Sequence, residues 1–153
     1  MTDSAIGAAT DGWSAYDSSV WPADAGQLAA MRAAVHRWLA PFGLSDDTEH
    51  DVVLAVSEAA TNAVEHAYPP DDPDGRVELT FWCDDESLHI AVVDRGTWRE
   101  PPTGPRSRGF GLPMMRRLVA AVAIEHAGRG TRVVLRHPLD RPEPTTPGGA
   151  GRR

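Results

Sequence analysis

The sequence predicts an α+β domain in which helices cover one face of a mixed, mostly antiparallel sheet. Two observations carry this prediction. Apolar residues recur at helical and strand-like spacings in the order helix, helix, strand, strand, loop, helix, strand, strand. Short turns join adjacent strands, which is typical of antiparallel pairing. The chain has 153 residues, a length that suits one domain, and no internal repeat is visible.

The first helix is expected at residues 28–39. Asp24 with Gln27 resembles a capping box in front of it, and Pro41 ends the run. The apolar positions at helical spacing are Leu28, Met31, Val35, Trp38 and Leu39.

The second helix is expected to begin at a cap formed by Asp46 and Glu49 and to continue to the stop at Pro69–Pro70. Its apolar face consists of Val52, Val56, Ala59, Ala63 and Ala67. This long helix is therefore predicted to pack against a sheet along one side.

The strands follow from alternation of apolar and polar residues. Residues 76–83 and 88–94 alternate and are joined by the turn 84–87, which predicts a hairpin. A further strand is expected near residues 13–21, and two more at 122–126 and 132–136, joined through a turn at 128–130.

Between the hairpin and the last strands, residues 95–108 contain three prolines and no aliphatic residue, so we expect a long functional loop that forms a lid. A helical pattern follows this loop. Its apolar side is predicted to consist of Met115, Leu118, Val119 and Val122.

Composition limits the function classes. Hydrophobic residues make up 41% and charged residues 24% of the chain, as in ordinary globular proteins. No apolar run approaches the roughly 18 residues of a membrane span, and the N-terminus lacks the layout of a signal peptide. A net charge of −7 argues against direct nucleic-acid binding. The single Cys83 agrees with a reducing compartment, so we expect a cytoplasmic protein without membrane contact.

The two ends differ in composition from the middle. Residues 1–12 are poor in large apolar side chains, and residues 138–153 are rich in Pro and Gly. We therefore expect a flexible N-terminus (1–12), one domain (13–137) and a disordered tail (138–153).

The second helix carries a polar stripe. Glu58, Asn62 and Glu65 recur at i, i+4 and i+7, with His66 beside them. A Glu and an Asn one turn apart can serve as a general base and a ligand for a hard metal ion. The alternative is an ordinary solvated helix face.

Two further segments suit a nucleotide. Asp94 ends an expected strand, where its carboxylate can accept a hydrogen bond from an exocyclic amine such as that of adenine, and Gly96 permits close approach of the backbone. The run 109–111, Gly-Phe-Gly, opens a helix, whose N-terminus favours phosphate. The alternatives are an ordinary turn Asp and a plain loop-to-helix junction.

The order of four segments resembles the N, G1, G2 and G3 boxes of the GHKL ATPase/kinase superfamily. These segments are LAVSEAATNAVEHAY, VVDRG, RGFGLPMMRRL and a GT pair before the last strand. The resemblance spans about residues 24–135 and is closest to the bacterial anti-sigma factors that are serine/threonine kinases. It implies a Bergerat-type α/β sandwich that binds ATP between its helices and a mobile lid.

The resemblance also implies a role for each matching residue. Glu58 would be the general base and Asn62 the Mg²⁺ ligand, while the role of His66 stays open. Asp94 would read adenine, with Gly96 beside it. Arg108 would contact the terminal phosphate, with Arg106 as the alternative. The remaining matches, on the phosphate side or near adenine, are Gly109, Phe110, Gly111, Leu112 and Thr131.

The implied function is an ATP- and Mg²⁺-dependent serine/threonine kinase that phosphorylates a STAS-domain anti-anti-sigma protein, regulates a sigma factor, and has relatives that dimerise. A non-catalytic docking module is the alternative, because Trp98 stands where the common G1 pattern has a second glycine. A third interpretation is a water-directed ATPase or a detached histidine-kinase catalytic domain.

Overall fold

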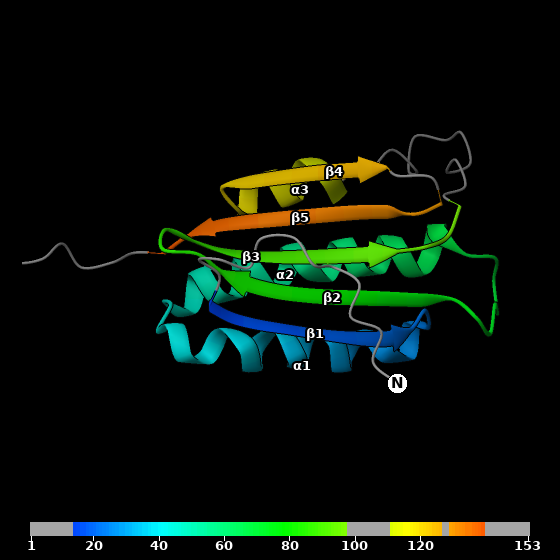
Figure 1. Ribbon diagram of the computed structural model, residues 1–153, viewed down its shortest axis with the longest axis horizontal. Helices are drawn as coiled ribbons and strands as arrows, with labels where there is room; N and C mark the ends of the chain where they lie inside the picture. The colour runs from blue at the N-terminus through cyan, green and yellow to red at the C-terminus, as the bar shows by residue number, and fades with distance from the viewer. Residues whose placement is uncertain (1–13, 98–110, 127–128, 140–153) are drawn as a thin grey trace, which may run out of the picture.

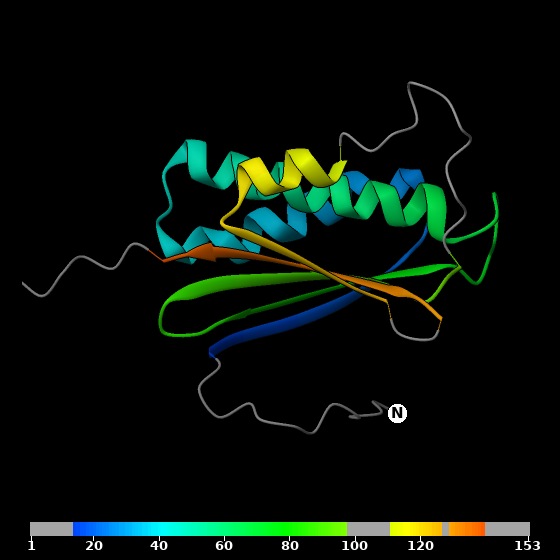
Figure 2. The same ribbon diagram turned by 90° about the horizontal axis from the view of Figure 1, so that it is seen from above.

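The computed structural model describes residues 14–97, 111–126 and 129–139. Within these ranges five strands form one sheet, with three α-helices alongside it (Figure 1). The helices all lie on the same face of the sheet (Figure 2). The predicted two-layer α+β class is confirmed.

The sheet has the strand order β1-β2-β3-β5-β4, and each of these described pairs is antiparallel. β1 (Ser14–Pro22) and β4 (Ala121–His126) form the two edges. β2 (Arg76–Cys83) and β3 (Ser87–Asp94) make the predicted hairpin, and β5 (Thr131–Pro138) lies between β3 and β4. The C-terminal end of β3 therefore lies beside the turn that joins β4 to β5.

The helix α1 (Leu28–Leu39) lies where its apolar spacing predicts it. The expected capping box was wrong in detail, because a short 3-10 turn (Ala25–Gln27) precedes the helix. Asp24 caps that turn, with its Oδ1 accepting a hydrogen bond from the Gly26 backbone N–H at 2.6 Å. Gln27 makes no side-chain capping bond to α1.

The helix α2 (Asp46–Asn62) is capped by Ser45, one residue before the predicted Asp46. The Ser45 Oγ accepts a hydrogen bond from the Thr48 backbone N–H at 3.2 Å. Asp46 instead opens the first turn, together with Asp47 and Glu49, where carboxylates interact favourably with the positive end of the helix.

The end of the second helix also differs from the prediction. After Asn62 the chain does not continue as a regular α-helix to the prolines, because residues Ala63–Ala67 form a turn of π-helix. Tyr68 then leaves the helix in an extended conformation, with φ −125° and ψ 154°. Turns of this kind are frequent at functional sites.

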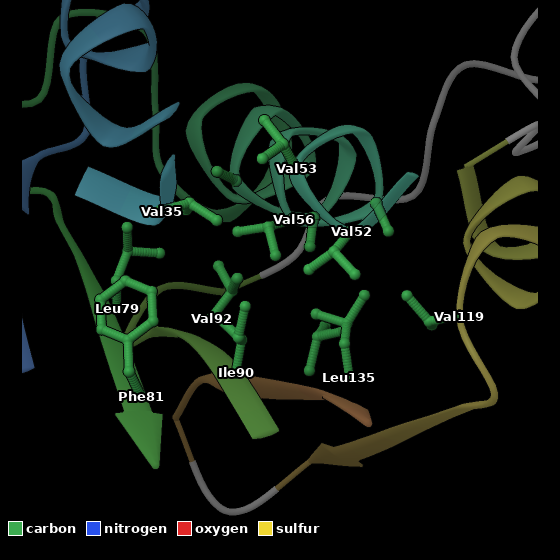
Figure 3. Packing of buried hydrophobic residues seen from close by; sticks show 14 of the residues in the cluster. Val35, Val52, Val53, Val56, Leu79, Phe81, Ile90, Val92, Val119 and Leu135 are labelled. Atoms are coloured by element: carbon green, nitrogen blue, oxygen red, sulfur yellow. The ribbon is translucent and has the colours of Figure 1, made fainter. Parts of the chain in front are cut away.

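The core lies between the helices and the sheet (Figure 3). Side chains alternate between the two faces along a strand, and β5 accordingly buries Thr131, Val133 and Leu135, whereas the edge strand β4 has no fully buried residue. The packed residues include Val35 from α1, Val52 and Val56 from α2, and Leu79, Phe81, Ile90, Val92 and Leu135 from the sheet. This packing fixes the rotation of α2 and so determines which of its residues remain accessible.

The helix α3 (Gly111–Leu118) buries Met115, and Val119 behind it is also buried. The prediction placed Val122 on the same helical side, which was wrong. Val122 belongs to β4 and pairs with Leu135 of β5. At the other end of β5 the strand includes Pro138, and the Leu139 backbone N–H donates to the Glu86 carbonyl at 2.8 Å.

Among the described helices, none combines the length and apolar character needed to cross a bilayer.

Candidate functional site

The first two residues of the polar stripe, Glu58 and Asn62, lie on one face of α2. Glu58 and Asn62 are both half-buried on the last turns of the helix. Residues four apart lie on one face of an α-helix, about 6 Å apart along its axis. The neighbouring Ala59 and Ala63 are buried in the core. A carboxylate and an amide are thus held side by side at the border of the apolar layer.

The π-turn changes the rest of the stripe. Hydrogen bonds in a π-helix span five residues rather than four, so side chains rotate less from one residue to the next. Glu65 consequently turns away from Asn62, and its side chain is 60% exposed. His66 is 33% exposed, and its Nε2 lies 3.8 Å from Glu65 Oε2. The predicted stripe is therefore continued by His66 rather than by Glu65.

The end of this π-turn meets the turn that follows β3. A Cβ placed on Gly96 would lie 2.0 Å from the carbonyl oxygen of Ala67, a distance that no side chain can occupy. This contact with the residue that ends the π-turn requires a glycine at position 96, and the predicted close approach of Gly96 to an adenine ring stays a prediction. The contact between Ala67 and Gly96 sets the position of Asp94 relative to Asn62.

Asp94 lies buried at the end of β3. Its exposed fraction is 3%, and its Oδ1 accepts a hydrogen bond from the Gly96 backbone N–H at 3.1 Å. Across the strand pair, Asp94 faces Thr131, which is 4% exposed. Gly130 precedes it with φ +124°, and a Cβ there would lie 2.2 Å from the Asp94 carbonyl oxygen. The structure therefore brings together Asp94 and Thr131, the two residues that were predicted to lie next to the adenine.

Two residues in this region were not predicted from the sequence. The Tyr68 hydroxyl donates to the Arg76 carbonyl at 2.5 Å and accepts from the Arg95 backbone N–H at 2.9 Å, so it ties the start of β2 to the end of β3. His126 Nδ1 lies 3.2 Å from Thr131 Oγ1. Tyr68 was predicted to lie in the last turn of the second helix, where an aromatic residue is too common a pattern to reveal its hydrogen bonds, and the contact of His126 depends on the strand order.

A cleft of about 460 Å³ lies next to the turn after β3. It is lined by residues 67–69, 95–97, Asp72, Asp74, Arg76 and Arg129. Neither Glu58 nor Asn62 lines it. A second hollow of about 420 Å³, between α1 and β1, includes none of the predicted site residues. We therefore base the site on the contacts of α2, β3 and β5 rather than on either hollow.

The predicted phosphate side is described only from Gly111 onward. Gly111 is the first residue of α3, in agreement with a helix N-terminus at this place. Leu112, predicted to contact the nucleotide, is half-buried with its side chain packed against the core. Trp98, Arg106, Arg108, Gly109 and Phe110 lie outside the described residues.

Together these residues make an arrangement with a defined chemistry. A buried carboxylate and a hydroxyl at the end of the sheet can accept hydrogen bonds from an amine. The half-buried Glu58 and Asn62 lie on the last turns of α2, just before the π-turn. A carboxylate and an amide oxygen in that place can act as a general base and as a ligand for a hard metal ion.

Comparisons with known proteins point to one family. A model described as histidine kinase-like ATPase domain matches residues 21–137. The serine-protein kinase RsbW of Bacillus subtilis is 29% identical over 123 residues, which cover 70% of this chain and 76% of that kinase. The anti-sigma F factor of Clostridium beijerinckii is 30% identical over 121 residues, which cover 71% of this chain and 83% of that protein.

Higher identities cover shorter stretches. RsbW of Bacillus licheniformis is 37% identical over 75 residues, and the match covers 49% of this chain and 47% of the kinase. The chain thus spans about half the length of this relative.

Solved structures agree with the fold. The RsbU and RsbW domains of a Mycobacterium tuberculosis protein superpose with a TM-score of 0.66 at 30% identity, covering 83% of this chain and 33% of that one. A blue-light activated histidine kinase of Erythrobacter litoralis superposes with a TM-score of 0.51 at 24% identity, over 74% of this chain and 60% of its own. The second likeness concerns the fold alone.

Proposed function

Because the chain belongs to the histidine kinase-like ATPase domain family, in its anti-sigma factor branch, we propose that it is an ATP-dependent serine/threonine protein kinase. Its acceptor would be a STAS-domain anti-anti-sigma protein, and its regulatory target a sigma factor. The protein would act on them in the cytoplasm. The names of the relatives, serine-protein kinase RsbW and anti-sigma F factor, support both halves of the proposal.

One observation carries the proposal. The helix that presents Glu58 and Asn62 ends in a π-turn whose last residue, Ala67, touches the glycine turn behind the buried Asp94. A single rigid connection therefore links the residues that suit phosphate chemistry to the residue that suits a nucleobase. Rigid placement of reacting groups is a large part of catalysis in phosphoryl transfer.

At the base end, Asp94 and Thr131 would bind the adenine. Both side chains are nearly inaccessible to solvent, so a hydrogen bond made there is not in competition with bulk water. At the phosphate end, the first N–H groups of α3 carry the partial positive charge of a helix N-terminus, and this charge would stabilise phosphate oxygens.

Glu58 would act as the general base. As the acceptor hydroxyl forms its bond to the γ-phosphorus, the bond to the β-phosphate oxygen breaks and ADP leaves. The hydroxyl proton would pass to the Glu58 carboxylate, which is half-buried and therefore held in place by its neighbours.

The side chains also fit a magnesium ion that is held largely by phosphate. Asn62 offers one neutral amide oxygen, and the described chain contains no cluster of three or more His, Cys, Asp or Glu side chains that could hold a metal. Mg²⁺ commonly binds through one or two protein ligands together with phosphate oxygens and water. Once bound, it would neutralise charge on the phosphate chain.

A transfer assay tests the kinase. The protein is mixed with Mg-ATP and the STAS-domain proteins of the organism that encodes it, and intact mass spectrometry follows each candidate. We expect one candidate to gain a phosphate on a Ser or Thr. No transfer to any of them, with ATP bound, would exclude the kinase function.

Two substitutions separate the roles on α2. Asn62→Ala should abolish Mg²⁺-dependent ATP binding, because it removes the proposed metal ligand. Glu58→Ala should keep ATP binding and lower transfer by about 10²- to 10⁴-fold, the usual contribution of a general base. Calorimetry measures binding, and the mass assay measures transfer.

Glu65→Gln is the matched control, because Glu65 lies about one turn beyond Asn62 and its side chain is 60% exposed. It should change neither binding nor transfer. Transfer by Glu58→Ala at the wild-type rate would contradict the role given to Glu58.

A non-catalytic docking module remains the second candidate, and Trp98 in the G1 segment favours it. Such a module would bind its protein partners while failing to transfer phosphate. Calorimetric titration with Mg-ATP separates the two, because a kinase must bind nucleotide.

A further inference from the structure

Three polar side chains form a row across one end of the sheet. Asp94 of β3 is the register partner of Thr131 of β5, and Thr131 is the register partner of His126 of β4. Directly paired residues of antiparallel strands point to the same face, with Cβ atoms about 4.5–5.5 Å apart. Thr131 lies two and four residues before Val133 and Leu135 on β5, so it shares their buried face. The row therefore faces the helices, as the nucleotide site does.

Burial changes along this row. Asp94 and Thr131 are 3% and 4% exposed, whereas His126 is exposed on the edge strand. Among the described residues, the Thr131 hydroxyl has one hydrogen-bond partner, Nδ1 of His126 at 3.2 Å. A solvent-accessible imidazole thus reaches the buried hydroxyl from outside the site.

We propose that His126 is a positioning residue that accepts the hydroxyl proton of Thr131 at Nδ1 and so turns the lone pairs of Thr131 toward the nucleotide base. A hydroxyl has one proton to donate and two lone pairs that accept. With the proton committed to His126, Thr131 presents only acceptor capacity to a ligand. The inference rests on the proposed function, because it assigns a role toward the bound base.

The consequence is a choice between purines. The carboxylate of Asp94 and the oxygen of Thr131 then offer two acceptors next to each other. Such a pair favours a base with an exocyclic amine and disfavours one with a carbonyl at the same position, since two facing acceptors leave buried lone pairs unsatisfied. If Nδ1 instead carried a proton, Thr131 could turn its own proton toward the ligand and accommodate the carbonyl.

Two nucleotides that differ only at the C6 edge of the base provide the test: adenine has a C6 amine and an N1 acceptor, whereas hypoxanthine has a C6 carbonyl and an N1–H donor. ADP carries an amine where inosine diphosphate carries a carbonyl. Calorimetry gives both dissociation constants for the full chain with Mg²⁺. We expect His126→Phe to reduce the preference for ADP over inosine diphosphate by roughly three- to tenfold, the size of one hydrogen bond.

His126→Asn tests for rescue, because its side-chain oxygen can occupy a place close to Nδ1 and accept the same proton. The preference for ADP should be largely retained in this variant. Glu125→Gln is the control, since Glu125 is the preceding residue on the opposite face of β4 and pairs with Arg132 rather than with the row. Its ratio should equal that of the wild type.

A double-mutant cycle distinguishes positioning from a general structural effect. In a Thr131→Val background, His126→Phe should leave the ratio of the two dissociation constants unchanged, because there is no hydroxyl left to orient. Nitrogen chemical shifts of the His126 ring in the ADP complex should place its proton on Nε2. Thermal unfolding of each variant confirms that it folds.

Each remaining outcome has one meaning. Nucleotide binding with an unchanged ratio in His126→Phe would overturn the inference and leave the proposed function standing. An equal change of the ratio with and without the Thr131 hydroxyl, or a proton on Nδ1, would do the same. Wild-type protein that binds neither nucleotide would overturn the proposed function and this inference together.

Discussion

At the scale of single residues, two buried polar side chains, Asp94 and Thr131, are register partners at one end of the sheet. Asp94 was predicted from its place at the end of a strand and Thr131 from the resemblance to the GHKL superfamily, and their contact with a nucleotide stays a prediction. Two neighbouring residues were missed: His126, whose Nδ1 lies 3.2 Å from Thr131 Oγ1, and Tyr68, whose hydroxyl accepts from the Arg95 backbone N–H. The partners of Asp94 and Thr131 depend on the insertion of β5 between β3 and β4, and local alternation carries no information on that order.

Gly96 allows a prediction at this scale. Gly96→Ala should destabilise the fold by about 1–3 kcal/mol, the usual cost of forcing extra volume into a packed region. The reason is the clash with the Ala67 carbonyl, which is backbone and has little freedom to move. Urea unfolding measures the change in the free energy of unfolding.

Gly43→Ala separates the clash from backbone strain. Gly43 has φ +63°, and a Cβ there meets nothing within 4 Å, so the variant costs only the strain of the left-handed conformation, about 1 kcal/mol. If the Gly96 site can relax without cost, Gly96→Ala will match the wild type in stability. Nucleotide affinity should also fall in Gly96→Ala alone, because the turn carries Asp94.

At the scale of elements, periodicity located the helices and strands but not the irregular turns between them. α1 and the β2–β3 hairpin follow the predicted spans closely, because their apolar residues keep one spacing throughout. The π-turn at Ala63–Ala67 was not predicted. Its alanines and valine fit an α-helix equally well, and the close contact of Ala67 with Gly96, which is distant in sequence, lies at its end.

The cap of α2 is testable. Ser45→Ala should lower the free energy of unfolding by about 1 kcal/mol, because it leaves the Thr48 N–H without its side-chain acceptor. Asp46→Asn, at the residue first predicted as the cap, should cost only a few tenths of a kcal/mol through weaker interaction with the helix dipole. Chemical denaturation compares the two variants. A larger loss in Asp46→Asn than in Ser45→Ala would show that Asp46 is the cap after all.

At the scale of the whole molecule, four weak motifs in the right order identified the family. Each segment alone fits an ordinary turn or helix face. All four in this order are expected together only in a fold that brings them to one end of the sheet. The match of a histidine kinase-like ATPase model to residues 21–137 confirms that assignment. The kinase activity and its partners stay proposals, because the residues expected to surround the phosphates include 98–110, outside the described ranges.

The face of the sheet opposite the helices holds a polar network that joins three strands. Asp84 Oδ1 accepts from the Glu86 and Ser87 backbone N–H groups at 2.8 and 2.7 Å, and its Oδ2 lies 2.7 Å from His89 Nε2. The His89 ring stacks on Trp82 at 5.1 Å, and the Arg132 guanidinium lies 5.7 Å from the Trp82 ring centre.

This network predicts a dependence of stability on pH. The Glu86 backbone hydrogen bond, followed by the hydrogen bond with His89, lowers the pKa of Asp84 below its ordinary value. A carboxyl whose pKa is lower in the folded state stabilises the fold above its unfolded pKa of about 4 and loses that contribution as the pH falls further. The free energy of unfolding should therefore decrease below about pH 4.

Asp84→Asn should make this acid decrease shallower, because the variant has no carboxyl to protonate. Asp71→Asn, on an exposed position before β2 whose φ of 60° Asn tolerates, is the control and should keep the wild-type slope. Urea unfolding at pH 6 and pH 3 measures both. Equal slopes in all three proteins would contradict the role of Asp84.

The single cysteine of the chain lies at a place where it can report on motion of the sheet. Cys83 ends β2, is 5% exposed, and is the register partner of Ser14 at the start of the edge strand β1. A thiol reagent can reach such a side chain only when the surrounding structure opens. The rate at which the native protein is labelled therefore measures how often this corner of the sheet comes apart, without any engineered probe.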